Sequence, residues 1–365
     1  MKKMKMEKKN KRIVTSPNED VAKDAVLAQQ EAQSKIKQII TDGVLNDKPK
    51  EMVEDAIKLV LKNYRKNSYL DKEEMNRVYN GLKIFAQNQF FLLWKNVETI
   101  RKKTLNKAIS MGIEIGDLTT NADGEEVQNV KSDTKDQFRS FVTTLDKGQP
   151  IIEDYQKKVA EEVKRLASTS ASMITEEGRQ LSLRNMAEQN VRYEANMEDV
   201  ENLKSEGVKL VFTSSHADCS KRCEKWQGKL FSLDGFRGNV DGYEVIPLDE
   251  ALNDNGGNSI INGFNCRHYL IEYEKGMDAP QHYSKAQIKK ERAIDQRQRQ
   301  YENTIRHKKE QYNLDKVNPD VDKGQLEKEK KSIKRMELNY RKYSLQNNRA
   351  SYMWRCQIDK DEEED

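Results

Sequence analysis

The chain is poor in the residues that define several common protein classes. Its 365 residues include only four cysteines and six prolines, and aromatic residues make up 7% of the total. This composition excludes a disulfide-dense secreted domain and a collagen-like chain. The longest apolar run is 90–94, far below the roughly 18 residues that a membrane-spanning helix needs. We therefore expect no membrane segment.

The N-terminus lacks the apolar stretch of a secretory signal peptide. Residues 1–12 contain seven Lys or Arg and one Glu, without hydrophobic periodicity. Together with the low cysteine content, this predicts a protein that is made and first used inside a cell, in a reducing cytoplasm. We interpret the segment as a disordered basic tail, and an arm that contacts nucleic acid is the alternative.

Charged residues are unusually frequent in the chain. Charged residues make up 35% of the sequence, against about 25% in an ordinary globular protein, whereas the formal net charge is only +4. A single core cannot extend over the whole length, so we expect solvated helices or tails beside it. The length predicts two to three domains at roughly 150 residues each.

Helical periodicity dominates the N-terminal half. Asp71 and Glu74 have the spacing of a capping box, and apolar residues follow at a period near 3.6. The apolar cluster 90–94 is wider than one stripe. It predicts a helix buried on several sides within the chain, which we favour, or a contact with a partner chain. A further helix is predicted from about Thr175 to Glu206.

The central segment changes to Gly, Asn and Asp turns with short strands, predicted at 208–212, 229–232, 243–246 and 268–273. The fold class is therefore α+β: a mainly helical chain with a small central turn-rich α/β module and long charged C-terminal helices. We predict five regions: a disordered basic tail (1–23), a helical N-terminal region (24–170), a central Cys/His module (171–280), a charged helical hairpin (281–356) and an acidic tail (357–365).

The C-terminal regions carry local charge of opposite signs. Residues 281–356 have a net charge of about +10, in two long segments, 281–313 and 324–356. Residues 359–365 hold six acids and one lysine, a charge of −5. The basic segments predict either a solvated helical surface or a surface for nucleic acid, and both interpretations stay open.

Two short hooks carry the chemically versatile residues of the central module. The first hook holds His216, Cys219 and Cys223 after a predicted strand, and the second holds Cys266 and His268 at the start of another. On an extended chain, residues two apart point to one side, so Cys266 and His268 can bind together. Thiolates and imidazoles are ligands for a tetrahedral zinc ion.

The five residues exceed the four positions of a structural zinc site, so one histidine is expected to orient a neighbour instead. A shared site requires the Cys223 and Cys266 sulfurs to lie within about 5 Å of each other. The alternatives are buried reduced cysteines, a disulfide, or a reactive thiol with a histidine base. The sequence shows no third residue that would orient such a catalytic pair.

The same segment resembles a known family. The matching elements are Leu183 to Ala187, Val191 to Glu194, Ser214 to Cys219, Cys223, Trp226 to Lys229, Ser232 to Gly235, Ile246 to Leu248 and Gly263 to His268. Through them the chain resembles the phage minor capsid protein 2 family and, more distantly, the Mu F-type head-morphogenesis proteins. In the last element, His268 stands where the Mu F-type proteins have a second cysteine.

The resemblance implies a structural minor capsid protein of a tailed bacteriophage, not an enzyme, that is associated with the portal and head and acts in head morphogenesis. The implied partners are portal, capsid or scaffolding proteins and packaged DNA. The implied location is the capsid interior or portal vertex, after assembly in the host bacterial cytoplasm. A DNA-binding head-interior protein acting through the basic helices, and a metal-dependent Cys/His enzyme, are the alternatives.

Overall fold

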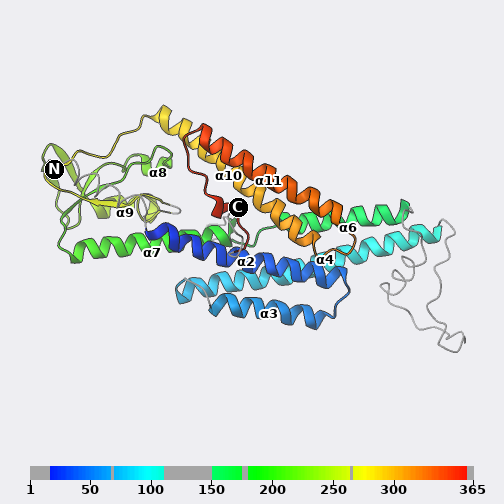
Figure 1. Ribbon diagram of the computed structural model, residues 1–365. Coiled ribbons are helices and arrows are strands. Elements are labelled where there is room, and N and C mark those ends of the chain that lie inside the picture. Colours follow the sequence, from blue (N-terminus) through cyan, green and yellow to red (C-terminus); the bar gives the residue numbers. More distant parts are fainter. Residues whose placement is uncertain (1–16, 67–69, 111–149, 175–179, 264–265, 360–365) are drawn as a thin grey trace, which may run out of the picture.

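The computed structural model describes residues 17–66, 70–110, 150–174, 180–263 and 266–359. The predicted basic segment 1–12 and most of the acidic tail lie outside them. Helices make up most of the described chain, and one small mixed sheet lies at one end (Figure 1). The predicted α+β class is confirmed. No helix in these ranges combines the length and hydrophobicity that a bilayer crossing requires.

Four helices form the N-terminal frame: α2 (Pro17–Leu45), α3 (Lys50–Lys66), α4 (Lys72–Ser110) and α6 (Pro150–Ser168). Their buried side chains share one apolar core with the start of α7. The first helix begins at Pro17, so residues 17–23 are helical, contrary to the predicted tail. We use "frame" below for these four helices. The division of the chain into five regions is not tested by the fold and stays a prediction.

The start of α4 has half of its predicted capping box. Asp71 Oδ1 accepts the backbone N–H of Glu74 at 3.0 Å, which satisfies a free donor of the first turn. The Glu74 side chain is used elsewhere: it accepts from Arg77 at 3.0 Å and from Asn190 of α7. The second hydrogen bond of a capping box, from the Asp71 N–H to the Glu74 side chain, is replaced by these contacts, which join α4 to α7.

The apolar cluster 90–94 does not lie inside the core. Leu93 is fully buried, but Phe91 and Trp94 are 61% and 41% exposed. The favoured expectation of burial within the chain was therefore wrong for most of the cluster. Helix α4 turns one side toward the other frame helices, and its opposite side faces solvent.

A short hairpin precedes α7 (Leu183–Ser205), the helix that was predicted from Thr175. Strands β1 (Ser172–Ile174) and β2 (Gln180–Ser182) pair antiparallel. Ser182 then caps the helix, because its side chain accepts the N–H of Asn185 at 3.2 Å. The predicted start was therefore too early: a strand and a capping serine precede the helix.

The central sheet has the order β5-β6-β4-β3-β7. Its strands are β3 (Leu210–Thr213), β4 (Leu230–Ser232), β5 (Gly238–Val240), β6 (Tyr243–Pro247) and β7 (Leu270–Glu272), with the short helices α8 (Lys221–Glu224) and α9 (Leu248–Gly257) between them. Four strands lie where the sequence predicts them, whereas β5 was not expected. The antiparallel pairing of β3 with β7 brings the two hooks to one end of the sheet.

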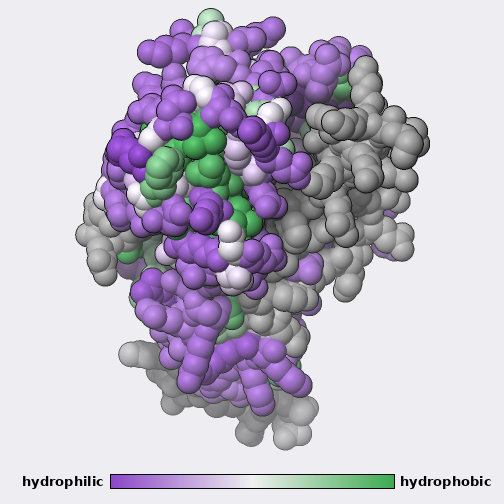
Figure 2. All heavy atoms as spheres, turned by 90° about the vertical axis from the view of Figure 1, so that its left-hand side faces the viewer, coloured by the Kyte–Doolittle hydropathy of each residue, from purple (hydrophilic) through white to green (hydrophobic). Residues whose placement is uncertain are grey.

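The two faces of the sheet pack differently. Val211, Phe231 and Ile246 share a core with α7, α9 and the cysteines. On the other face, Phe212, Leu230 and Val245 are covered by partly buried side chains, including Tyr243, Tyr273 and Met277. Seen from this end of the molecule, a strip of hydrophobic residues is bordered by hydrophilic ones (Figure 2).

Two long antiparallel helices, α10 (Lys285–Asp315) and α11 (Lys323–Gln346), cross the molecule, and α10 lies beside α2 and α6 (Figure 1). The second is shorter than predicted. It ends at Gln346, and the chain turns back through Asn348, whose φ is 53°, into the 3-10 turn η1 (Met353–Cys356). This return is fixed by Tyr340, whose hydroxyl accepts the N–H of Tyr352 at 3.0 Å.

Candidate metal centre

The first hook follows β3 and forms the short helix α8. The chain leaves the sheet after Thr213, and Ser220 begins the helix in an extended conformation. The Cys223 N–H donates to the Ser220 carbonyl at 3.0 Å, and the Ser220 hydroxyl donates to Cys223 Sγ at 3.2 Å. These two bonds fix the direction of the buried Cys223 side chain.

The second hook enters β7 from the loop after α9. Cys266 is buried, its N–H donates to the Gly263 carbonyl at 2.9 Å, and its Sγ accepts the N–H of Ile261 at 3.1 Å. Ile261 has a φ of 69°, a conformation that side chains with a branched Cβ rarely adopt. This turn directs the backbone N–H of Ile261 at the Cys266 sulfur and so fixes the position of that side chain.

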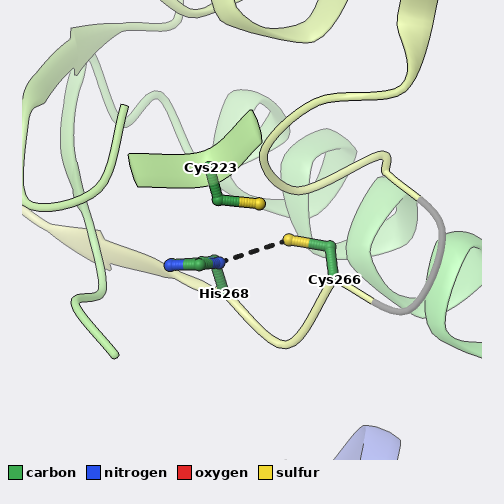
Figure 3. A group of neighbouring side chains, drawn as sticks. All are labelled: Cys223, Cys266 and His268. Carbon is green, nitrogen blue, oxygen red and sulfur yellow. Dashed lines mark hydrogen bonds between the residues drawn. The ribbon is translucent and has the colours of Figure 1, made fainter. Parts of the chain in front are cut away.

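The hooks meet at three side chains. The ligand atoms of Cys223, Cys266 and His268 all lie within 4.8 Å of one another, and all three residues are buried. Figure 3 shows the two sulfurs and one imidazole nitrogen turned toward a common point, with Cys266 Sγ 3.4 Å from His268 Nδ1. Ligands of a tetrahedral zinc lie roughly 3.3–3.8 Å apart at bond lengths of about 2.0–2.3 Å. The group is thus compatible with a metal site after small movements.

Gln227 determines which nitrogen of His268 faces the thiols. Its Oε1 accepts the backbone N–H of His216 at 3.0 Å, which identifies the atom as the oxygen. The same oxygen lies 3.4 Å from His268 Nε2 and can only accept a hydrogen bond. This contact leaves Nε2 against an acceptor and directs Nδ1 at Cys266. Metal-binding histidines in proteins are commonly held this way.

Of the two thiols in the group, one is favoured as a thiolate and the other as a neutral thiol. The hydrogen bond from the Cys266 thiol, followed by the effect of His268, lowers the pKa of Cys223 to about 4, although burial opposes this. The same hydrogen bond, together with burial, raises the pKa of Cys266. One thiolate is thus preferred at neutral pH, and a thiolate is the form that binds metal.

The other two predicted residues lie beside the group and not within it. The His216 ring contacts that of His268 edge-on, with centroids 4.6 Å apart, and its Nε2 lies 3.0 Å from Ser214 Oγ. Burial and the nearby His268 lower the pKa of His216 to about 4, so its ring is neutral. Cys219 packs in the apolar core, and burial raises the pKa of its thiol to about 11.

A cavity of about 220 Å³ opens beside the group. Asp218 in its wall is paired: it accepts from Arg267 at 3.0 Å and from Arg349 at 3.4 Å. Arg349 also pairs with Glu291 of α10 at 2.8 Å. Arg349 follows the end of α11 and Glu291 is near the start of α10, so these contacts join the first hook to one end of the helical pair. The sequence gives no signal for this role of Asp218, because its position next to Cys219 says nothing about a distant arginine.

A comparison with protein-family models identifies the relationship that the motifs suggest. The model of phage minor capsid protein 2 matches residues 152–343, from α6 through most of α11. The chain belongs to the phage minor capsid protein 2 family. The matched range contains both hooks and nearly all of the helical pair, so membership does not depend on the cysteines alone. No curated protein and no solved structure gave a significant match.

Membership in this family implies a structural role in a phage virion, in contact with other virion proteins. Family members are generally structural, and the described residues supply no evidence of catalysis. What the geometry adds is the buried group of Cys223, Cys266 and His268, which joins segments more than forty residues apart in sequence.

Proposed function

We propose that this minor capsid protein acts in head morphogenesis of a tailed phage, associated with the portal vertex or the inner surface of the head. The observation that carries the proposal is the match over residues 152–343, which covers the Cys/His module and the helical pair as one unit. The long, highly charged helices fit a chain that lies along neighbouring proteins. Assembly would take place in the host bacterial cytoplasm, and no catalytic step is part of the role.

The position of the chain in the assembled particle tests this role. Cross-linking of purified particles, followed by mass spectrometry, should give cross-links from α10 or α11 to the portal or the major capsid protein. Empty heads should carry the same cross-links, because morphogenesis precedes DNA packaging. A chain found only outside the head, or only in tails, would refute the proposal.

Within this role, the Cys/His group serves as a structural zinc site. Cys223, Cys266 and His268 would supply three ligands, and Cys219 and His216, which line the adjacent cavity, are the candidates for the fourth position. When bound, zinc would link the two hooks, and the protein residues would do the rest: Gln227 orients His268, and Ser220 positions Cys223. Elemental analysis of full-length protein, purified without chelator, should find about one zinc per chain.

Two alanine variants make the elemental analysis specific. Cys223→Ala should lose the zinc, whereas Cys356→Ala should retain it, because Cys356 is buried among α10 and α11 residues. Zinc absent from the wild-type protein, or equally retained by both variants, would refute the site.

A further inference from the structure

Helix α11 forms an outer edge of the molecule. It packs on α10, which lies between α11 and the frame (Figure 1). Ile333 and Tyr340 are its buried apolar residues, and Tyr340 lies against Tyr301 of α10 with ring centroids 6.1 Å apart. This contact defines the inner side of α11, and the opposite side faces away from the molecule.

The outer side of α11 exposes two leucines that the fold does not use. Leu338 is 65% exposed and Leu345 is 77% exposed. At about 100° per residue, both lie roughly 140–160° around the helix from Tyr340. They are seven residues apart, so they form one line along the helix, about 10 Å from Cα to Cα. Such spacing is typical of a helix that contacts another helix.

Basic residues border this line on both sides. Lys334 and Arg341 lie on one side and Arg335 and Lys342 on the other, and all four are exposed. Arg335 and Lys342 form no ion pair with the rest of the described chain. The acidic Glu337 is turned inward and pairs with Lys309 at 3.0 Å. Over its whole length α11 has eight Lys or Arg and three acids, a net charge of +5.

We propose that this leucine line with its basic borders, which we call the outer face of α11, binds an acidic amphipathic helix of another virion protein. Apolar residues of that helix at i and i+3 or i+4 would cover Leu338 and Leu345. Its flanking Asp or Glu would meet Arg335 and Lys342, as charged residues do at the edges of coiled coils. The virion setting rests on the proposed function, whereas the binding itself can be tested without it.

The leucines favour a protein partner over nucleic acid. Phosphate groups attract the bases but gain nothing from exposed leucines, because phosphate contacts are electrostatic. A helix partner uses both features together. The exposed apolar residues of α4, including Phe91, lack a border of one charge, so they do not indicate the chemistry of any partner.

Binding can be measured with the full-length protein and two synthetic 28-residue helices. Both helices have leucine at positions a and d of four heptads; one has Glu and the other Lys at e and g, so that neither pairs with itself. Fluorescence anisotropy should show binding of the acidic helix and none of the basic helix. Absence of binding by the acidic helix, or equal binding of both, overturns the proposal.

Variants then assign the binding to the outer face. Leu338→Ser with Leu345→Ser, and separately Arg335→Glu with Lys342→Glu, should each weaken the acidic helix about tenfold or more. The matched controls are Leu59→Ser on α3 and Lys289→Glu with Lys290→Glu on α10, which are also exposed and should change nothing. All positions are at the surface, and far-ultraviolet circular dichroism checks folding.

Binding of duplex DNA tests the alternative interpretation, that the outer face of α11 binds phosphate groups. If a 20-base-pair duplex binds more tightly than the acidic helix, and the charge variant abolishes this binding while the leucine variant does not, the face is a phosphate-binding surface and the proposal is wrong. Equal losses in the control variants would also contradict it. Neither result would affect the location of the chain in the particle, which the cross-linking experiment measures separately.

Discussion

The frame and the central module are stabilised in different ways. The frame buries a large core in which nearly every member is aliphatic or aromatic, with Ile36, Leu82 and Leu93 fully buried. The core of the module is smaller, and Cys219, Cys223 and Cys266 occupy places in it. Small cores commonly need a further stabilising element such as a metal. The frame is held by apolar packing, whereas the proposed zinc would supply the stabilisation that the smaller core of the module lacks.

The largest expected effect comes from removing a thiol of the module. Cys223→Ala should lower the free energy of unfolding of the zinc-loaded protein by about 4 kcal/mol or more, because metal binding is coupled to folding. Urea unfolding followed by tryptophan fluorescence can report this, since Trp226 packs in the module core. A strong chelator should destabilise the wild type and leave Cys223→Ala unchanged. An equal effect of chelator on both proteins would contradict the account.

A buried ion pair between the frame and α10 gives the next largest effect. Lys37 of α2 and Glu310 of α10 lie 3.5 Å apart and are almost fully buried, and Lys37 Nζ also donates to the Ala167 carbonyl at 2.9 Å. Lys37→Met should cost about 3 kcal/mol, because it leaves Glu310 buried without its partner. The double variant with Glu310→Met should regain most of that loss in urea unfolding.

This ion pair also sharpens the comparison between the regions. Zinc content of the Lys37→Met protein should equal that of the wild type, because the pair is remote from the hooks. A loss of zinc in this variant would show that the frame and the module are not independently stabilised.

A smaller effect is expected from the residue that orients His268. Gln227→Leu removes the acceptor for His268 Nε2 and should lower zinc affinity about 10- to 100-fold, the range for such supporting residues. Competition with a chromophoric chelator measures the affinity. Gln296→Leu, a change in the wall of the same cavity, is the matched control and should have little effect. Comparable losses in the two variants would show that Gln227 has no special role.

The smallest effect is a pH dependence in the helical pair. Burial, followed by the charge of Asp315, raises the pKa of Glu329 to about 7 from an ordinary 4.5. Between these values the folded chain holds a proton that the unfolded chain has released, so stability falls as the pH rises through this window. Solvent exposure limits the effect to under about 1 kcal/mol.

Substitution isolates this contribution. Glu329→Gln should stabilise the protein more at pH 8 than at pH 5, and the exposed Glu327→Gln should show no such difference. Unfolding by urea at the two pH values measures both. A Glu329→Gln effect that is equal at pH 5 and pH 8 would rule out the raised pKa.

The sequence predicts the composition of the module better than its contacts. Periodicity and turn residues located four of the five strands, since alternating side chains and Gly-rich turns are local signals. Strand β5 (Gly238–Val240) was missed because its glycine and asparagine are poor strand formers. It forms through pairing with β6, which is a tertiary effect.

The candidate site shows the same limit. The spacing of Cys266 and His268 correctly indicated that they lie together, and Cys223 joins them because β3 and β7 are paired. Spacing alone could not decide whether Cys219 or His216 belongs to the group, because Cys219 and Cys223 are equally suited by their spacing to bind a metal. The sequence around Gln227 shows only that it follows Trp226. Its contact with His268 forms when the chain folds, so it could not be predicted from the sequence.

X-ray absorption at the zinc edge of the full-length protein tests the central claim, that the two hooks close on one metal ion. The account predicts a shell of at least two sulfur atoms at about 2.3 Å and at least one nitrogen at about 2.0–2.1 Å. A protein that binds no zinc, or a zinc ion surrounded only by oxygen and nitrogen, would contradict it.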